Sequence, residues 1–232
     1  LQISTRNPLV IDIQDIHLSK GEQLGAVEYE EFISSGDPNF SWEMPDDEWD
    51  SLALNYTSGT TGNPKGVVLS HRGAYLNSIG NLLAWEMERS PVYLWTLPLF
   101  HCNGWCFPWS ITALGGTHVC LRKVEPVDIL ESISKNNVSH LCGAPIVLNM
   151  ITNGPKKYLK KIPKGIKVMT AGAPPPSAVI KTCESHGMEI THSYGLTEVY
   201  GPCVVSEWNS AWDGYSPDEK AALKARQGVR YL

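Results

Sequence analysis

The sequence predicts an α/β fold in which layered, largely parallel sheets are flanked by helices. From Ser51 onward, short apolar or β-rich stretches alternate with stretches whose apolar residues recur at helical spacing. Strands that alternate with helices in this way pair mostly in parallel. The composition, with 42% hydrophobic and 19% charged residues, is typical of a globular protein that has a sizeable core.

Residues 1–50 are expected to form a partial N-terminal segment and a loop. An apolar run at 9–13 is followed by an acidic, proline-containing stretch, DPNFSWEMPDDEWD, at 37–50. Such a stretch favours a surface loop that leads into the first strong strand. We therefore separate 1–50 from a core domain at 51–232.

The core domain is expected to contain short strands that are apolar or β-rich. They lie at 52–56, 66–69, 92–97, 116–121, 138–142, 167–170 and 189–192. Helices are expected at 74–88, where Ser70 supplies an N-cap, and at 126–136 and 176–184.

The last expected helix has a complete start signal. Ser216 can act as N-cap, Pro217 as the first helical residue and Glu219 as the partner of a capping box, ahead of the stretch KAALKAR. Gly228 then stands where a helix usually stops.

The charge pattern argues against two classes of partner. The formal net charge is -5, and Lys and Arg form no block, so neither nucleic acid nor an anionic membrane surface is expected as the main partner. No stretch approaches the roughly 20 apolar residues of a membrane-spanning helix. No signal peptide is visible.

The cysteines are dispersed, without a Cys-x-x-Cys pair. They are Cys102, Cys106, Cys120, Cys142, Cys183 and Cys203. We expect reduced, mostly buried thiols of an intracellular protein. A zinc site built from His101, Cys102 and Cys106 is disfavoured because no second ligand cluster supports it. Because the chain begins at Leu1 rather than Met, we expect a piece of a longer protein.

The strongest functional signal is the stretch LNYTSGTTGNPKGVVLSHR at 54–72. Residues 57–62 offer hydroxyl groups and unobstructed backbone N–H groups, which suit phosphate oxygens, and Lys65 adds a positive charge. A linker or a hairpin turn can have the same composition. A P-loop is excluded, because that pattern requires Gly before its Lys and Pro64 precedes Lys65.

YTSGTTGNPKGV closely resembles the phosphate-loop signature of the adenylate-forming enzymes, the superfamily of acyl-CoA synthetases, firefly-type luciferases and peptide-synthetase adenylation domains. Three further segments match in the family's order. LPLFHCNG at 97–104 resembles the segment whose His borders the acyl and pantetheine tunnel. TAGAP at 170–174 resembles a turn that lies against adenine, and YGLTE at 194–198 an adenylate-contacting segment.

The resemblance spans about 51–201 and more faintly the rest. It implies that 51–232 is the core of the AMP-binding domain, part of the large N-terminal domain of such an enzyme. The C-terminal domain, with its catalytic Lys, and the ribose-binding Asp have no counterpart here, so the chain alone is expected to be inactive.

The resemblance also implies a set of phosphate and metal contacts. The residues that would hold the β- and γ-phosphates of ATP are Thr57, Ser58, Gly59, Thr60, Thr61 and Gly62. Lys65 would orient these phosphates, unless it is a solvated surface lysine. Thr197 would hydrogen-bond the α-phosphate. Glu198 would bind Mg²⁺, which takes one or two protein carboxylates, unless it caps or pairs near a helix start.

Adenine would be bound by two of the segments. Gly172, Ala173 and Pro174 would lie against it, and Tyr194, followed by Gly195, would stack on it. The alternative for Tyr194 is ordinary core packing.

The resemblance implies that His101 lies where the tunnels for the carboxylic acid and for the CoA thiol meet. A buried structural histidine is the alternative, and we assign it no general-base role. Trp105, Phe107 and Trp109 either line an acyl pocket or pack in the core.

LPLFHCNGWCF, together with 208–226, most resembles plant-type acyl-activating enzymes of the short-chain, medium-chain or aromatic acid group. This resemblance implies an AMP-forming acid:CoA ligase that uses ATP, Mg²⁺ and CoA on a small carboxylic acid. Two alternatives stay open: an adenylation domain that loads a carrier protein, and a non-catalytic nucleotide-binding fragment. The compartment, cytosolic or peroxisomal, and the oligomeric state are not predicted.

Overall fold

A computed structural model describes residues 8–15, 17, 21–57 and 62–231 of the chain. The chain divides into two compact units, at residues 1–44 and 45–232, which are considered separately. In the first unit, β1 (Ile11–Asp12) and β2 (Val27–Glu28) form a short parallel pair, followed by α1 (Tyr29–Ser34). Residues 37–50, expected as a loop, contain no helix or strand.

The second unit begins with a hairpin that leads into a helix. β3 (Ser51–Tyr56) and β4 (Gly66–Ser70) pair antiparallel, so the Gly-rich stretch joins two hairpin strands. Helix α2 (His71–Ala84) follows directly, and the Ser70 side chain accepts a hydrogen bond from Gly73 N, which confirms the predicted N-cap. The helix ends before the predicted residue 88, because Glu86 adopts a left-handed conformation with φ of 45°.

The remaining strands form one sheet, in the order β11-β10-β9-β8-β7-β5-β6. They are β5 (Val92–Trp95), β6 (Thr117–Cys120), β7 (His140–Gly143), β8 (Ile166–Thr170), β9 (Met188–Leu196), β10 (Gly201–Val205) and β11 (Val229–Arg230). Strands β5 to β9 pair in parallel, as predicted. Strands β10 and β11, which the sequence did not predict, extend one edge of the sheet antiparallel.

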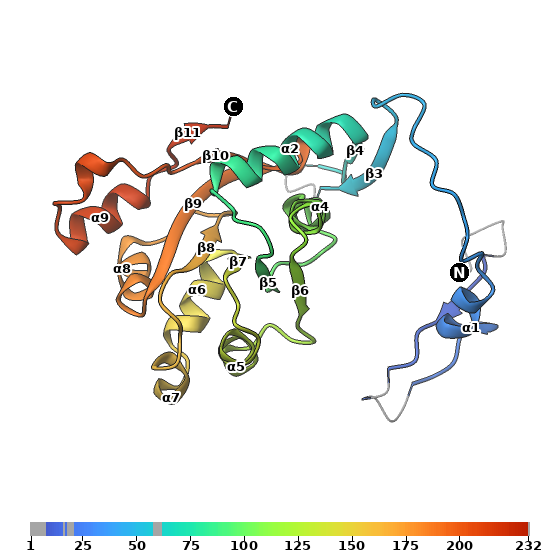
Figure 1. The fold of residues 1–232 in the computed structure, drawn as a ribbon, viewed down its shortest axis with the longest axis horizontal. Helices are drawn as coiled ribbons and strands as arrows, with labels where there is room; N and C mark the ends of the chain where they lie inside the picture. Colours follow the sequence, from blue (N-terminus) through green and yellow to red (C-terminus); the bar gives the residue numbers. More distant parts are fainter. Residues whose placement is uncertain (1–7, 16, 18–20, 58–61, 232) are drawn as a thin grey trace. The chain divides into compact units, whose positions relative to one another are not determined.

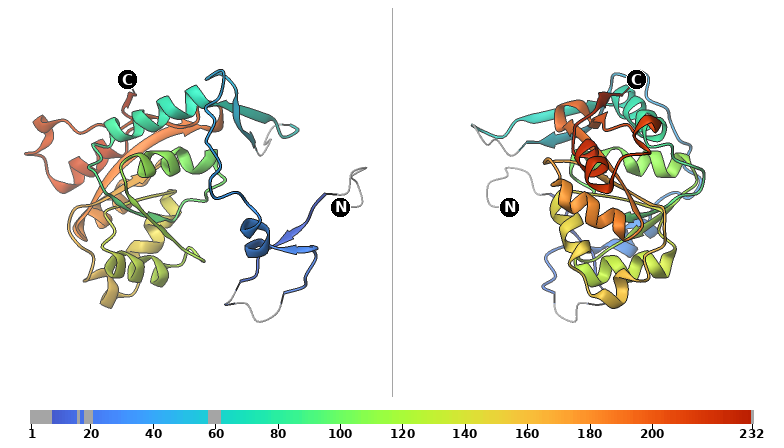
Figure 2. Two further views of the ribbon diagram at one scale, coloured as in Figure 1. Left: turned by 45° about the vertical axis from the view of Figure 1, so that its right-hand side comes forward. Right: turned by 90° about the vertical axis from the view of Figure 1, so that its left-hand side faces the viewer.

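Helices cover both faces of this sheet (Figures 1 and 2). One face packs on α5 (Pro126–Asn136), α6 (Pro145–Thr152), α8 (Ser177–Ser185) and α9 (Pro217–Lys224). The other packs on α3 (Cys102–Trp105) and α4 (Phe107–Ala113). The shorter elements are α7 (Lys156–Leu159) and the 3₁₀ turns η1 (Thr197–Val199) and η2 (Ser210–Trp212).

Strand β5 shows why helices pack on both faces of the sheet. Val92 and Leu94 contribute to a largely aliphatic cluster with α5 and α6, whereas Tyr93 and Trp95 contribute to an aromatic cluster with α3 and α4. Successive side chains of a strand point to opposite faces, so an apolar strand without polar alternation must be buried on both. Two large apolar clusters therefore fix the position of this strand.

The predicted start of α9 is confirmed, whereas its predicted end is wrong. The capping box of Ser216 and Glu219 is present, but α9 ends at Lys224, well before Gly228. Gly228, with φ of +89°, instead leads into β11, and a Cβ added at Gly228 would lie 2.0 Å from Val205 O.

All six cysteines are free, and four are buried, but Cys120 is exposed and Cys203 is half-buried.

His140 of β7 is a buried titratable group in the aromatic face. It is 6% exposed, and the ring of Trp85 packs edge-on against it at 5.0 Å between ring centroids. Its Nδ1 lies 2.8 Å from Ser139 Oγ, and its Nε2 has no hydrogen-bond partner among the described residues. Burial, and then the charge of Lys167, lower the pKa of His140 from 6.5 to about 4.

We predict that acid destabilises the fold through His140. Between pH 6.5 and about 4 the unfolded chain binds a proton that folded His140 does not, so the free energy of unfolding falls as the pH falls through this window. The full effect is at most about 3 kcal/mol. Urea unfolding across this range should show a weaker pH dependence for His140→Asn. Equal pH dependence in parent and variant would contradict the prediction.

Candidate functional site

Three of the sequence motifs follow parallel strands at the same edge of the sheet. The segment 97–104 comes after β5, 170–174 begins at the last residue of β8, and 194–198 spans the end of β9. Because β5, β7, β8 and β9 run parallel, their carboxyl ends lie together. In open α/β sheets, ligands bind outside this edge. The topology therefore brings together segments that are far apart in the sequence.

The base of the Gly-rich hairpin is attached to the segment 97–104 and to Tyr200, which follows the segment 194–198. Asn55 of β3 donates from Nδ2 to Asn103 Oδ1 at 2.6 Å. Ser70, the last residue of β4, donates its backbone N–H to the hydroxyl of Tyr200 at 3.1 Å. The hairpin itself is closed by the bond from Thr57 N to Lys65 O at 3.0 Å. The hairpin strands are thus fixed beside the carboxyl edge of the sheet.

The residues expected to bind phosphate are only partly described. Thr57 is half-buried, and its Oγ1 lies 3.4 Å from the backbone N of Lys65. Gly62 and the Lys65 side chain are exposed. The remaining expected contacts, Ser58, Gly59, Thr60 and Thr61, lie outside the described residues.

Thr197 and Glu198 form the 3₁₀ turn η1 directly after β9. Thr197 is half-buried, and its Oγ1 lies 3.4 Å from Cys102 Sγ, whereas Glu198 is exposed. Burial raises the pKa of the Cys102 thiol, the hydrogen bond with Thr197 lowers it, and the charge of Glu198 raises it again. The net shift is upward, so the thiol stays protonated at neutral pH.

Within the described part of the chain, no three or more His, Cys, Asp or Glu side chains gather as a metal site.

His101 begins the turn that follows β5, and its side chain is exposed. Its backbone N–H donates to Pro98 O at 3.1 Å, and the preceding Phe100 is 81% exposed. The alternative of a buried structural histidine is therefore wrong. The imidazole lies at the surface of the described chain.

The residues expected around adenine are also accessible. Gly172, Ala173 and Pro174 are exposed, and Gly172 has a φ of +86° that a side chain would disfavour. Tyr194 is 38% exposed and belongs to neither buried cluster. Its exposed ring is a surface on which a flat group could stack.

The turn at 102–106 has a left-handed backbone, which was not predicted from the sequence. The φ angles of Cys102, Asn103, Gly104, Trp105 and Cys106 are all positive, from 43° to 64°. Left-handed geometry at residues with a Cβ is unfavourable and is maintained only by the surrounding structure.

Helices α2 and α4 hold this turn in place. Asn81 of α2 donates from Nδ2 to Trp105 O at 2.8 Å, and the Ser110 hydroxyl of α4 donates to Cys106 O at 3.2 Å. Asn55, through its bond to Asn103, adds a contact from the hairpin. A Cys-Asn-Gly sequence gave a weak signal for such a turn, since Asn and Gly tolerate left-handed geometry.

The three aromatic residues after His101 differ in position. Trp105 and Phe107 are buried, at 6% and 0% exposure, in the aromatic cluster. Trp109 is half-buried and lines an apolar cavity of about 290 Å³ between β3, α2 and α4. Core packing therefore accounts for Trp105 and Phe107.

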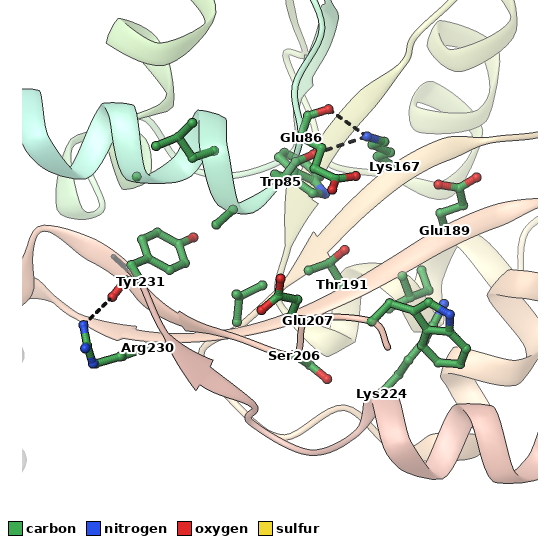
Figure 3. A pocket seen from close by; sticks show the side chains of 16 residues that line it. Trp85, Glu86, Lys167, Glu189, Thr191, Ser206, Glu207, Lys224, Arg230 and Tyr231 are labelled. Atoms are coloured by element: carbon green, nitrogen blue, oxygen red, sulfur yellow. Dashed lines mark hydrogen bonds between the residues drawn. The ribbon is translucent and has the colours of Figure 1, made fainter. Parts of the chain in front are cut away.

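A cavity of about 540 Å³ lies away from the motif segments (Figure 3). Lys167 and Glu189, near the amino ends of β8 and β9, line it together with Trp85, Lys224 and Tyr231. The Lys167 ammonium donates to Trp85 O and Glu86 O at 3.2 and 3.0 Å. None of the expected site residues that are described lines this cavity.

A parallel sheet with these segments at its carboxyl edge, beside a Gly/Ser/Thr-rich hairpin, defines an adenylate-forming type of domain. The chain belongs to the AMP-binding enzyme family, which it matches over residues 9–229. The resemblance found in the motifs is thus confirmed.

Plant acyl-activating enzymes are among its relatives. The chain is 51% identical, over 98% of its length, to the peroxisomal acetate/butyrate–CoA ligase of Arabidopsis thaliana, of which it covers 41%. It is 50% identical, over 90% of its length, to an acetate–CoA ligase of Humulus lupulus, of which it covers 37%. It is 44% identical, over 97% of its length, to the peroxisomal trans-cinnamate:CoA ligase of Petunia hybrida, of which it covers 40%. The chain therefore spans about two fifths of the length of these relatives.

Solved structures share the fold. An o-succinylbenzoate CoA synthetase from Bacillus subtilis, bound to its acyl-adenylate intermediate, matches with a TM-score of 0.73 at 23% identity, over 89% of this chain and 40% of that one. The N-terminal domain of FACL13 from Mycobacterium tuberculosis matches with a TM-score of 0.70 at 24% identity, over 78% of this chain and 46% of that one. These matches confirm the predicted α/β architecture.

We predict that Gly195 cannot accept a side chain. A Cβ there would lie 1.7 Å from Gly201 O on the paired strand β10, so Gly195→Ala must push β9 and β10 apart. We expect a loss of roughly 1–3 kcal/mol in the free energy of unfolding, the range of overpacked sites. Urea unfolding of parent and variant measures it.

The matched control is Gly214→Ala. A Cβ at Gly214 would meet nothing within 4 Å, so its effect should stay within about 0.5 kcal/mol. Equal stability of the Gly195 and Gly214 variants would refute the steric argument.

Proposed function

We propose that this chain supplies the nucleotide-binding part of an AMP-forming acid:CoA ligase, an acid–thiol ligase that activates a carboxylic acid with ATP and transfers the acyl group to CoA. The observation that carries the proposal is the convergence of the segments 97–104, 170–174 and 194–198 at one sheet edge, beside the base of the Gly-rich hairpin. Membership of the AMP-binding family and the names of the plant relatives support it.

In the proposed first step, a carboxylate oxygen of the acid attacks the α-phosphorus of ATP, and pyrophosphate leaves. Both reactants are anions, so fixed dipoles and cations must offset their repulsion. Backbone N–H and hydroxyl groups of residues 57–62 would contact the β- and γ-phosphates. Lys65 would add one positive charge, and Thr197 would donate a hydrogen bond to the α-phosphate.

Mg²⁺, when bound, would neutralise part of the phosphate charge. Glu198 suits this ion because it is an exposed carboxylate that adjoins Thr197 in η1. Mg²⁺ usually takes only one or two protein carboxylates and completes its shell with phosphate and water oxygens. A single carboxylate is therefore a sufficient protein contribution.

The base of the nucleotide would occupy the accessible surface formed by Gly172, Ala173, Pro174, Tyr194 and Gly195. In the second step the CoA thiol would attack the acyl-adenylate carbonyl, and AMP would leave. His101, exposed at the start of the turn after β5, would lie at the meeting point of acid and thiol.

The substrate class proposed is a short-chain, medium-chain or aromatic carboxylic acid. The relatives are named as ligases of acetate, butyrate, 2-methylpropanoate and trans-cinnamate. A panel of these acids is the first choice for assays.

We also propose that 51–232 forms the core of the AMP-binding domain and that 1–50 is a partial N-terminal segment. For location we propose the cytosol or the peroxisome, since two of the three relatives described above carry the word peroxisomal in their names. Among the described residues, the structure holds no helix with the length and apolar character to span a bilayer.

We predict acid-dependent exchange of labelled pyrophosphate into ATP by a protein of the relatives' full length that contains this chain. Glu198→Ala should lower the exchange rate roughly a hundredfold, because it removes the proposed metal ligand. Lys65→Ala should lower it by roughly tenfold or less, since that charge is exposed to water.

Glu207→Ala, which removes an exposed carboxylate at the cavity of Figure 3, is the control and should leave exchange unchanged. A lack of exchange with every acid would remove the ligase proposal. Equal exchange rates for Glu198→Ala and the parent would contradict the assignment of Glu198 as metal ligand but not the ligase proposal. Release of AMP only when CoA is present separates a CoA ligase from an enzyme that loads a carrier protein.

A further inference from the structure

Tyr200 joins two parts of the molecule that are 130 residues apart in the chain. Its hydroxyl oxygen lies 3.1 Å from Ser70 N, which donates to it, and 3.1 Å from Ser70 Oγ. Ser70 is at once the last residue of β4 and the N-cap of α2. One phenol group therefore contacts the junction between the Gly-rich hairpin and the helix that follows it.

Helix α2 is shaped to receive this ring. A Cβ at Gly73 would lie 2.0 Å from Cζ of Tyr200 and 2.3 Å from its hydroxyl oxygen, so only glycine fits in this first turn. Asn77, four residues further and thus on the same face of the helix, donates from Nδ2 to Pro202 O at 2.7 Å. The segment 200–202 is therefore bound along one side of α2.

The backbone of Tyr200 is fixed as tightly as its side chain. Its N–H donates to Thr197 O at 3.2 Å and so closes the turn η1, and its carbonyl oxygen accepts from Cys106 Sγ at 3.4 Å. Its φ is +70°, a conformation that a residue with a Cβ adopts only when its surroundings require it. Tyr200 is thus held at three points, and one of them is the carbonyl oxygen of Thr197.

We infer that Tyr200 is a positioning residue for the triphosphate of Mg·ATP: it keeps the Thr197–Glu198 turn in register with the Gly-rich hairpin through the Ser70–Gly73 junction. This inference rests on the proposed function, because it needs the hairpin and the turn to act on one nucleotide. Phosphate contacts on the hairpin and metal contacts on η1 must keep a fixed separation to bind one triphosphate, and small displacements weaken such sites strongly.

The contact between Tyr200 and the Ser70–Gly73 junction can be tested by melting temperature, without an activity assay. In the parent chain, Gly73→Ala should lower the melting temperature, because the new methyl group displaces the Tyr200 ring from Ser70. In a Tyr200→Ala background the same change should raise it, because the clash is gone and Ala favours a helix over Gly. An equal effect of Gly73→Ala in both backgrounds would overturn the contact.

The functional half is tested by Tyr200→Phe in the full-length protein, which keeps the ring and loses the hydroxyl. We expect the dissociation constant of Mg·ATP, measured by titration calorimetry, to rise roughly tenfold, about the effect of one lost hydrogen bond. The KM for Mg·ATP in pyrophosphate exchange should rise by a similar factor, with a smaller change in kcat. Tyr215→Phe, a half-exposed tyrosine before α9, is the control and should change neither value.

The outcomes separate the two claims. If the parent binds Mg·ATP and Tyr200→Phe binds it equally well, the positioning role is overturned while the proposed function stands. If the parent binds Mg·ATP but exchanges no pyrophosphate with any acid, the ligase proposal fails, and the ratio of the two dissociation constants still decides the role of Tyr200. A parent that does not bind Mg·ATP overturns both.

Discussion

The parallel pairing of β5, β7, β8 and β9 is the constraint on which the candidate site depends. Because the strands run in one direction, their carboxyl ends lie at one edge, and the loops that leave them are brought together whatever their separation in the sequence. Burial on both faces fixes this register: Leu141 packs in the aliphatic cluster and the adjacent Cys142 in the aromatic one. A slip of one residue would exchange the two faces and disrupt both clusters.

Around this edge, polar contacts of α2 determine how the loops meet. Gly73, Asn77 and Asn81 follow one another at four-residue intervals, and they contact Tyr200, Pro202 O and Trp105 O respectively. The left-handed turn at 102–106 costs about 1–2 kcal/mol at each residue with a Cβ, whereas one hydrogen bond contributes about 1 kcal/mol net. The turn therefore depends on burial of Trp105 and Cys106 as well as on its hydrogen bonds.

Local patterns predicted the elements that local interactions determine. Helix 126–136, which begins at Pro126, was predicted to the residue. The caps at Ser70 and Ser216 are present, because each side chain accepts a hydrogen bond from the N-terminus of the helix that follows it. Contacts over long range escaped prediction: β10 and β11 exist through pairing with β9, and Tyr200 reaches Ser70 across 130 residues. For the site, the motifs located the segments, but the hydrogen bonds that orient them, from Asn55 to Asn103 and from Ser70 to Tyr200, could not be predicted from the sequence.

The exposure of the candidate residues sets a physical limit on what this arrangement achieves by itself. Glu198, His101 and the Lys65 side chain all face water, where a pair of charges interacts with only about 1 kcal/mol at contact distance. Activation of a carboxylate by ATP requires stronger fields, which arise when water is excluded from around the reacting groups. The described chain supplies the sheet edge and the loops that leave it, whereas exclusion of water from that edge would require a cover. Mobile covering elements perform this task in many enzymes, and the plant relatives are more than twice as long as this chain. Under the proposed function, the contacts of α2 and Tyr200 therefore provide the pre-organised half of the site, and the strength of its electrostatics depends on what closes over it.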